Sequence, residues 1–261
     1  VTEQQLLAIF RTAAEKNPGP QTVVVAAAGN VQHEALVELV EASFKGSTAH
    51  RASSNGHGHA PRPAAPILIE QKKELEQVHL VIAAPWPDAR STERYAASLL
   101  ASVVGGGTSS RLWQRIREER GLVYSVGAGG NTFSDVGVFT IYAGTSPEHL
   151  DEVLDLALEE VRRVITESVS PDELKLAKDQ AISSILLGLE SSSGRVSALA
   201  RQEIIHGRRI SPEEIVQNIE AVNVEDLQEV ARKFFTNDSL ALGALGNLNG
   251  FKVDRRLLQV E

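Results

Sequence analysis

The segment over residues 110–126, SRLWQRIREERGLVYSV, contains the side chains best suited to chemistry. A charged helix is predicted to end at its glycine, and a strand begins at once. Arg117 in the last turn of this helix and Tyr124 early in the strand can then lie close together. Their guanidinium and phenol donors suit backbone carbonyls or a developing oxyanion. The alternative is a surface helix followed by a tyrosine that packs beside Leu122 and Val126.

A run of three glycines lies directly before that helix, at Gly105, Gly106 and Gly107. Backbone amides at the start of a helix can bind a phosphate. However, the run lacks the Gly-Lys-Ser/Thr of a P-loop, and it follows a predicted helix, whereas the dinucleotide motif follows a strand. We therefore expect either a flexible backbone that hydrogen-bonds an extended peptide or a plain connector between helices.

The histidine spacing provides no zinc motif in this sequence. Seven histidines and no cysteine are present, and no histidine is followed three or four residues later by another, the spacing that places two imidazoles on one helical face. We therefore expect this chain to bind no metal. His79, on a predicted strand, is either a hydrogen-bonded structural residue or a catalytic one, and His206 is expected to be a cation at a helix C-terminus.

The elements that must position these residues include both strands and helices. The patterns predict strands at residues 67–70 and 77–84, helices at 92–104 and 109–120, a hairpin of 122–133 with 138–143, and a long helix from Pro147. Two further helices open at Pro171 and Pro212, each after a capping serine. Hairpin strands segregated from a run of helices predict an α+β fold, with a mainly antiparallel sheet covered on one face by helices.

The two ends of the chain resemble each other. A capped helix from Thr2 is followed by an apolar strand at 22–28 that closes at Gly29-Asn30-Val31. Near the end, a helix after Asn223 is followed by a strand at 239–245 that closes at Gly246-Asn247-Leu248. A chance resemblance is the alternative, because a helix–strand unit is common. If both stretches close the same type of domain, the chain contains the tail of one copy and a complete second copy.

That interpretation predicts four segments. Residues 1–46 form the C-terminal tail of a preceding domain, and residues 47–66, which are rich in proline and have no apolar period, form a linker. Residues 67–250 form the second domain, and residues 251–261 form a C-terminal tail.

Composition excludes several classes of function. Lys and Arg total 26 against 34 Asp and Glu, and the formal net charge of -8 disfavours a nucleic-acid partner. The longest apolar run, residues 23–28, is far short of the ~20 residues that span a bilayer, so no membrane association is expected. Methionine is absent, so we expect a fragment or a processed product. The compartment stays open, with the cytoplasm as the default.

The glycine run, Ser109-Ser110-Arg111-Leu112, and above all Arg117-Glu118-Glu119-x-Gly121-Leu122-x-Tyr124-Ser125-Val126 resemble a known family. It is the pitrilysin, insulysin and mitochondrial-processing-peptidase family of zinc metallopeptidases, and the resemblance is to its non-catalytic C-terminal domain. It spans nearly the whole chain, because residues 1–46 resemble the end of the family's first domain.

The resemblance implies two similar α+β domains that face each other, with an H-x-x-E-H helix and a distal glutamate holding zinc in the first domain. It implies that Arg117 binds a peptide carbonyl, that Tyr124 helps to stabilise the tetrahedral intermediate, and that Gly105 to Gly107 form a substrate-binding loop. Zinc would belong to the full-length protein, with none bound by this chain, so the chain alone is expected to be inactive. A peptide or unfolded polypeptide is the expected substrate, and a homodimer the expected assembly.

Two functions stay open at this point. The first is the C-terminal substrate-binding half of a zinc endopeptidase. The second is a non-catalytic subunit or scaffold of the same fold that binds peptides or protein partners. Retention of both Arg117 and Tyr124 favours the first, because a scaffold has no physical need for that pair.

Overall fold

The computed structural model describes residues 23–45 and 64–260. The chain divides into two compact units. The smaller comprises Val1–His59 and Gly188–Arg209, and the larger comprises Ala60–Leu187 and Ile210–Glu261. The larger unit contains the sheet and the segment with Arg117 and Tyr124. Within the described residues, no helix is both long and apolar enough to cross a bilayer.

The larger unit is built on a five-stranded sheet with the order β1-β5-β2-β4-β3. Its strands are β1 (Ile67–Gln71), β2 (Val78–Trp86), β3 (Val123–Thr132), β4 (Gly137–Thr145) and β5 (Ala241–Gly246). β1 pairs with β5 in parallel, and the other pairs are antiparallel. Alternate residues of β2 are buried along its whole length, as expected for a strand with one face on a core. The other face of the sheet carries the less buried residues.

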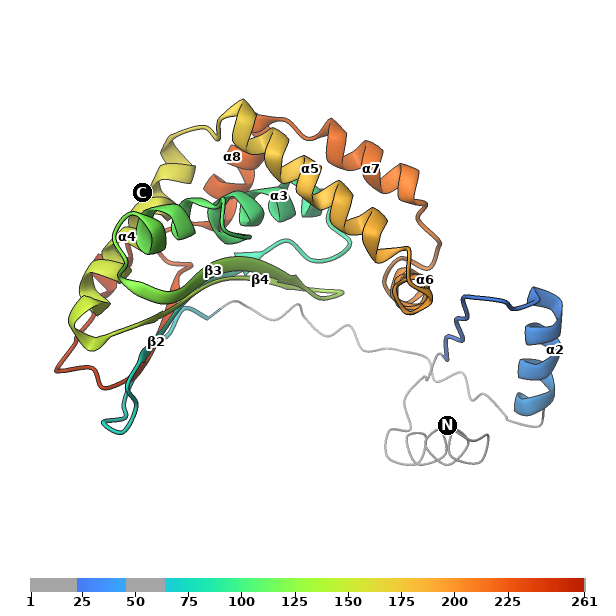
Figure 1. The fold of residues 1–261 in the computed structure, drawn as a ribbon, viewed down its shortest axis with the longest axis horizontal. Helices are drawn as coiled ribbons and strands as arrows, with labels where there is room; N and C mark the ends of the chain where they lie inside the picture. Colours follow the sequence, from blue (N-terminus) through green and yellow to red (C-terminus); the bar gives the residue numbers. More distant parts are fainter. Residues whose placement is uncertain (1–22, 46–63, 261) are drawn as a thin grey trace. The chain divides into compact units, whose positions relative to one another are not determined.

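Helices cover the buried face of this sheet. They are α3 (Arg94–Gly105), α4 (Leu150–Thr166), α5 (Pro171–Gly188), α7 (Pro212–Ala221) and α8 (Val224–Phe234). Figure 1 shows α3, α5 and α7 on the same side of β3 and β4. The predicted α+β fold, a mainly antiparallel sheet with helices on one face, is confirmed. The two helix starts after capping serines are also confirmed, at the first residues of α5 and α7.

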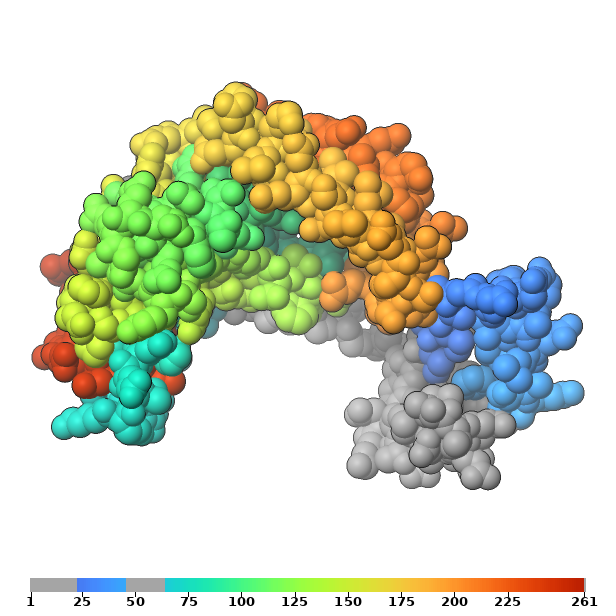
Figure 2. All heavy atoms as spheres, viewed as in Figure 1, coloured from blue at the N-terminus to red at the C-terminus, as the bar shows by residue number. Residues whose placement is uncertain are grey.

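An aromatic cluster joins the sheet to the helices. The ring centroids of Trp86 and Phe139 lie 4.8 Å apart, and those of Phe139 and Phe235 lie 5.1 Å apart. Gly130 lies against the indole of Trp86, because a Cβ at this position would lie 2.6 Å from Nε1. In Figure 2 the tip of the β3–β4 hairpin (yellow-green) reaches the surface beneath α5.

The last residues of the chain are part of the larger unit. Leu258 and Val260 are buried, and the guanidinium of Arg162 on α4 donates to the carbonyls of Leu257 and Gln259. The described part of the segment predicted as a tail, residues 251–260, therefore contributes to the core through its apolar side chains.

The smaller unit contains α2 (His33–Phe44) and α6 (Ser192–His206) within the described residues. The strand predicted at residues 22–28 is wrong for its described part, because residues 23–28 are not assigned to a strand and no described strand pairs with them. The helix predicted from Thr2, and most of the predicted linker, lie outside the described residues. His206 lies in the last turn of α6, the position predicted for it, and Gly207 follows with φ +64°.

Candidate functional site

The segment over residues 109–120, predicted to be one helix, has a widened helical turn in the structure. A π-helix occupies Trp113–Glu118, where the amide of Glu119 donates to the carbonyl of Gln114 at 2.9 Å. Such widened turns are rare and occur frequently at functional sites. This one keeps Ile116 fully buried while Arg115 reaches the carboxylates of α4.

Arg117 lies near the end of the π-helix and contacts the start of β3. Its Nη1 donates to the backbone carbonyl of Val123 at 2.8 Å. That carbonyl belongs to the peptide bond that leads into Tyr124, so the structure brings the two predicted residues together. The chain turns between them at Gly121, whose φ of +65° favours glycine. The guanidinium carries further N–H groups that could serve a ligand.

Tyr124 lies at a β-bulge. The register passes from Val123 opposite Thr145 to Ser125 opposite Gly144, so Tyr124 is the extra residue of β3. Bulges of this kind re-aim a side chain, and they are common next to active sites. Tyr124 is 64% exposed, whereas Leu122 and Val126 are both 8% exposed. The alternative of a tyrosine packed beside those two residues is therefore wrong.

An ion cluster around the buried carboxylate of Glu160 holds the π-helix against α4. Glu160 is 1% exposed, and its Oε1 accepts from Nη1 of Arg115 at 2.6 Å and from Nη1 of Arg163 at 3.1 Å. Nη2 of Arg115 also lies 2.6 Å from Glu159. These carboxylates raise the pKa of Arg115, and the hydrogen bond to Arg115 lowers the pKa of Glu159. Arg115 therefore ties the segment that bears Arg117 to the core.

A second ion pair links Arg111, just before the π-helix, to Glu173 on α5. The Nε and Nη2 groups of Arg111 donate to the two carboxylate oxygens of Glu173 at 2.6 and 2.9 Å. This fork-to-fork geometry is the strong form of an arginine–carboxylate pair. The hydrogen bond from Arg111 is the main cause that lowers the pKa of Glu173 from 4.5 to about 2.

The glycine loop packs between α3, β3 and α5. A Cβ on Gly105 would lie 2.1 Å from the amide nitrogen of Ala128, so this position requires glycine for the close approach of α3 to β3. Gly107 has open space around its Cα, and its carbonyl accepts from Oγ of Ser110 at 2.6 Å. Of the three glycines predicted to bind substrate, Gly105 is buried, whereas Gly106 and Gly107 are exposed.

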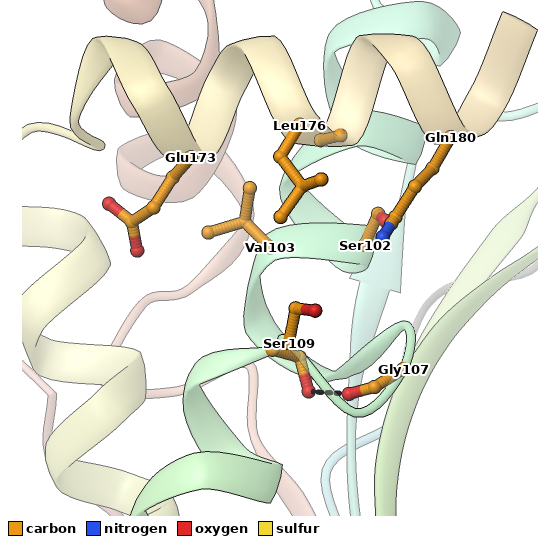
Figure 3. Close-up of a pocket in the computed structure, with 9 residues that line it drawn as sticks. Ser102, Val103, Gly107, Ser109, Glu173, Leu176 and Gln180 are labelled. Atoms are coloured by element: carbon orange, nitrogen blue, oxygen red, sulfur yellow. Dashed lines mark hydrogen bonds between the residues drawn. The ribbon is translucent and has the colours of Figure 1, made fainter.

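A cavity of about 30 Å³ lies between this loop and α5. Figure 3 shows it, with Ser102 and Val103 of α3 facing Leu176 and Gln180 of α5. It has room for roughly one water molecule. This cavity is too small for a peptide, whereas an open pocket of about 660 Å³ lies between Gly106, Gly107 and α5. Binding of a peptide by the loop stays a prediction.

His79 is hydrogen-bonded, as expected for the structural alternative. Its Nδ1 lies 2.9 Å from the hydroxyl of Tyr142 across the β2–β4 pair. Sequence reasoning did not identify Tyr142, nor the half-buried Arg115 and its buried partner Glu160. A weak signal existed for Glu160, because it lies three residues after Ala157 on the apolar side of α4.

The described residues do not fit a zinc site. They contain no group of three or more His, Cys, Asp and Glu side chains that could hold a metal ion. At this site Arg117 and Tyr124 carry groups that can donate hydrogen bonds.

Comparison with known proteins defines the family. The Peptidase M16 inactive domain family matches residues 7–181, and the chain belongs to this family. This confirms the resemblance to the zinc-free domain of these metallopeptidases.

Proteins that bear the name "uncharacterized zinc protease" are similar in sequence. One from Mycobacterium tuberculosis is 37% identical over 218 residues, which cover 82% of this chain and 49% of that protein. One from Bacillus subtilis is 32% identical over 224 residues, which cover 85% of this chain and 54% of that protein. The chain therefore spans about half the length of the curated relatives that it matches.

Solved structures share the fold. A peptidase M16 inactive domain from Pseudomonas fluorescens aligns with a TM-score of 0.72 at 23% identity, over 82% of this chain and 50% of that chain. A chain of complex III2 from Candida albicans aligns with a TM-score of 0.76 at 22% identity, over 88% of this chain and 57% of that chain.

Proposed function

We propose that the chain is the C-terminal substrate-binding half of a zinc metalloendopeptidase. The observation that carries the proposal is the geometry of one segment. Tyr124 is exposed at a bulge, and Arg117 is anchored on the carbonyl next to it. The names of the relatives and the family of this domain agree with the proposal.

In this proposal Tyr124 and Arg117 act on the peptide by hydrogen bonding. The phenol of Tyr124 donates to the oxyanion that forms when the scissile carbonyl becomes tetrahedral, and Arg117 donates to a neighbouring peptide carbonyl. A donor that is already in place needs little reorganisation as charge develops, which is why such groups contribute strongly to rate. The Val123 carbonyl holds the guanidinium of Arg117, and the pair of Arg115 with the buried Glu160 ties the same segment to α4.

Zinc would be held by a first domain in the full-length protein, where it would activate the attacking water. We propose that residues 1–46 are the end of that domain, 47–66 the linker, 67–250 the second domain and 251–261 its tail. The backbone supports the internal resemblance. Gly29 and Gly246, the corresponding glycines of the two ends, have φ values of +130° and +149°, a region that other residues rarely adopt.

The partners follow from the same proposal. The substrate is a peptide or an unfolded polypeptide, and the full-length protein is a homodimer. Sedimentation of the full-length protein tests the assembly, since a monomer at all accessible concentrations would contradict it.

The test of the proposal uses the full-length protein. We expect the coding sequence upstream of Val1 to contain H-x-x-E-H followed at a distance by a glutamate, and the purified protein to cleave unstructured peptides. Chelation should abolish cleavage and zinc should restore it. An upstream region without the motif, together with peptide binding but no cleavage, would instead support the non-catalytic subunit or scaffold.

A further inference from the structure

A pocket of about 500 Å³ lies between α3, the end of β3, α5 and α7, within the larger unit. Figure 2 shows the surface hollowed between α5 and the β3–β4 hairpin. Aliphatic side chains from all four elements line the pocket, namely Leu99, Ala128, Ala181, Ile185, Ile215 and Ile219. The volume lies within the range of about 300–1,000 Å³ that is typical of ligand pockets, and the lining suits an apolar group of a ligand.

Arg94, the first residue of α3, lines this apolar pocket without a carboxylate partner. Its Nη1 donates to the carbonyl of Ser91 at 2.9 Å, and its Nη2 donates to the hydroxyl of Tyr95 at 2.9 Å. Among the described residues no Asp or Glu forms an ion pair with it, and the neighbouring Glu93 pairs instead with Lys233 at 2.7 Å. A guanidinium has five N–H groups, so this half-buried side chain has N–H groups left for an anionic ligand.

The indole N–H of Trp86 is a second donor in the pocket. Trp86 is 4% exposed, yet its Nε1 donates to none of the residues that the structure describes. Gly130 lines the pocket beside it, and a Cβ there would lie 2.6 Å from Nε1, so glycine at this position leaves the N–H uncovered. A buried polar group without a partner is unusual and costs free energy. An acceptor atom of a ligand in the pocket would supply the missing partner.

The pocket continues along α3 towards the glycine loop. Ser98, Ser102 and Gly106 line both this pocket and the open pocket of about 660 Å³ beside α5. Ser98 and Ser102 lie one turn apart on the same side of α3, and their hydroxyls make no hydrogen bond to another described residue. Hydroxyls both donate to and accept from peptide groups. They therefore favour a ligand with a peptide backbone over a plain hydrocarbon chain.

We propose that this pocket binds the C-terminal residue of a peptide, where that residue has an apolar side chain. Arg94 and the N–H of Trp86 bind the terminal carboxylate, the aliphatic wall receives the last side chain, and the preceding residues extend over Ser98 and Ser102 towards the glycine loop. The proposal deepens the proposed function, on which it rests. The pocket adjoins the end of β3, whereas Tyr124 lies near the start of that strand, so the two contacts with the substrate are separate.

The test compares two ways of damaging the pocket. Arg94→Met removes the cation and keeps most of the apolar stem, and Ile185→Asp places a carboxylate in the aliphatic wall. Arg256→Met is the matched control, because it makes the same change of charge at an exposed arginine outside the pocket that also has no carboxylate partner among the described residues. Urea unfolding of the three variants verifies that they are folded.

The probes are peptides that carry fluorescein at the N-terminus and end in leucine, either as the free acid or as the carboxamide. Their binding to the full-length protein is measured by fluorescence anisotropy with metal chelated, so that the result does not depend on cleavage. We expect the free acid to bind about tenfold more tightly than the carboxamide, the effect of a hydrogen bond between charged groups. A peptide acid that ends in aspartate should bind more weakly than the one that ends in leucine, because the wall is apolar.

Octanoate, a free aliphatic acid, distinguishes a peptide end from any apolar carboxylate. We expect it to displace the labelled peptide only at concentrations far above those at which the unlabelled peptide acid does so. Octanoate that competes as well as the peptide acid would contradict the assignment of the pocket to a peptide.

We expect Arg94→Met to bring the ratio of acid to carboxamide affinity close to one, Ile185→Asp to reduce it severalfold, and Arg256→Met to retain it. The proposal is overturned if wild type binds the acid and the carboxamide equally, or if Arg94→Met keeps the wild-type ratio. Peptide cleavage by wild type without a preference for the acid would leave the peptidase function standing and overturn the pocket assignment. A preference for the acid that is lost in Arg94→Met, without any cleavage when zinc is restored, would support the pocket and contradict the peptidase function.

Discussion

The buried pair of Arg115 and Glu160 provides the sharpest test of how the site is supported. Arg115→Met keeps most of the apolar stem and removes the charge that faces a carboxylate with 1% exposure. Two unit charges about 4 Å apart interact by roughly 4 kcal/mol at an effective dielectric constant near 20. Removing one partner of a buried pair costs about 3–5 kcal/mol. Because Arg163 still contacts Glu160 at 3.1 Å, we expect a loss of about 3 kcal/mol.

Glu160→Gln is the matched comparison. It removes the buried charge at constant shape, and Arg115 keeps its second partner, Glu159, at 2.6 Å. The expected loss is therefore smaller, about 1 kcal/mol.

The assay is urea unfolding followed by tryptophan fluorescence. Both tryptophans of the chain, Trp86 and Trp113, lie in the larger unit, so the signal reports the unit that contains the pair. A loss below about 1 kcal/mol for Arg115→Met, or a larger loss for Glu160→Gln than for Arg115→Met, would refute the reasoning. In the full-length protein, Arg115→Met should also lower kcat, because the π-helix that positions Arg117 loses its anchor.

The other predictions concern the glycine loop and the pair of Arg111 with Glu173. Gly105→Ala should destabilise the larger unit by at least about 1–3 kcal/mol, since its Cβ would overlap Ala128, whereas Gly107→Ala, in open space, should change the urea midpoint little. Glu173 has its pKa lowered from 4.5 to about 2, so its ion pair stabilises the fold above pH 4.5, and that stability is lost as the pH falls toward 2. At neutral pH the urea midpoint of wild type should therefore be higher than that of Glu173→Gln, and the difference between the two midpoints should disappear near pH 2. A difference that stays constant with pH would contradict the claim that the ion pair provides this stability.

Much of the larger unit follows from local sequence patterns. The alternation of apolar residues, the serine caps and the apolar stripe of α4 are local features of the sequence. They predict the strands, the helix starts and the covered face correctly. The strand predicted at residues 22–28 fails for a physical reason. A strand needs hydrogen-bonded neighbours, and no described strand pairs with residues 23–28.

The candidate site could be located from the sequence, but its construction could not. The order of Arg117, a glycine and Tyr124 predicts their proximity. The π-helix, the bulge and the burial of Glu160 depend on contacts between residues far apart in the chain, such as Arg115 with Glu160. The hydrogen bond of His79 with Tyr142 depends in the same way on strand register, which single-sequence patterns do not specify.

The most direct test of the central claim is the steady-state kinetics of peptide cleavage by full-length Tyr124→Phe. Tyr142→Phe is the control, because it removes the same hydroxyl from β4, where Tyr142 is hydrogen-bonded to His79. We predict that Tyr124→Phe lowers kcat about 100-fold, the typical effect of losing one oxyanion donor, with little change in KM, and that Tyr142→Phe retains wild-type rates. Wild-type kcat in Tyr124→Phe would contradict the claim that this phenol stabilises the transition state.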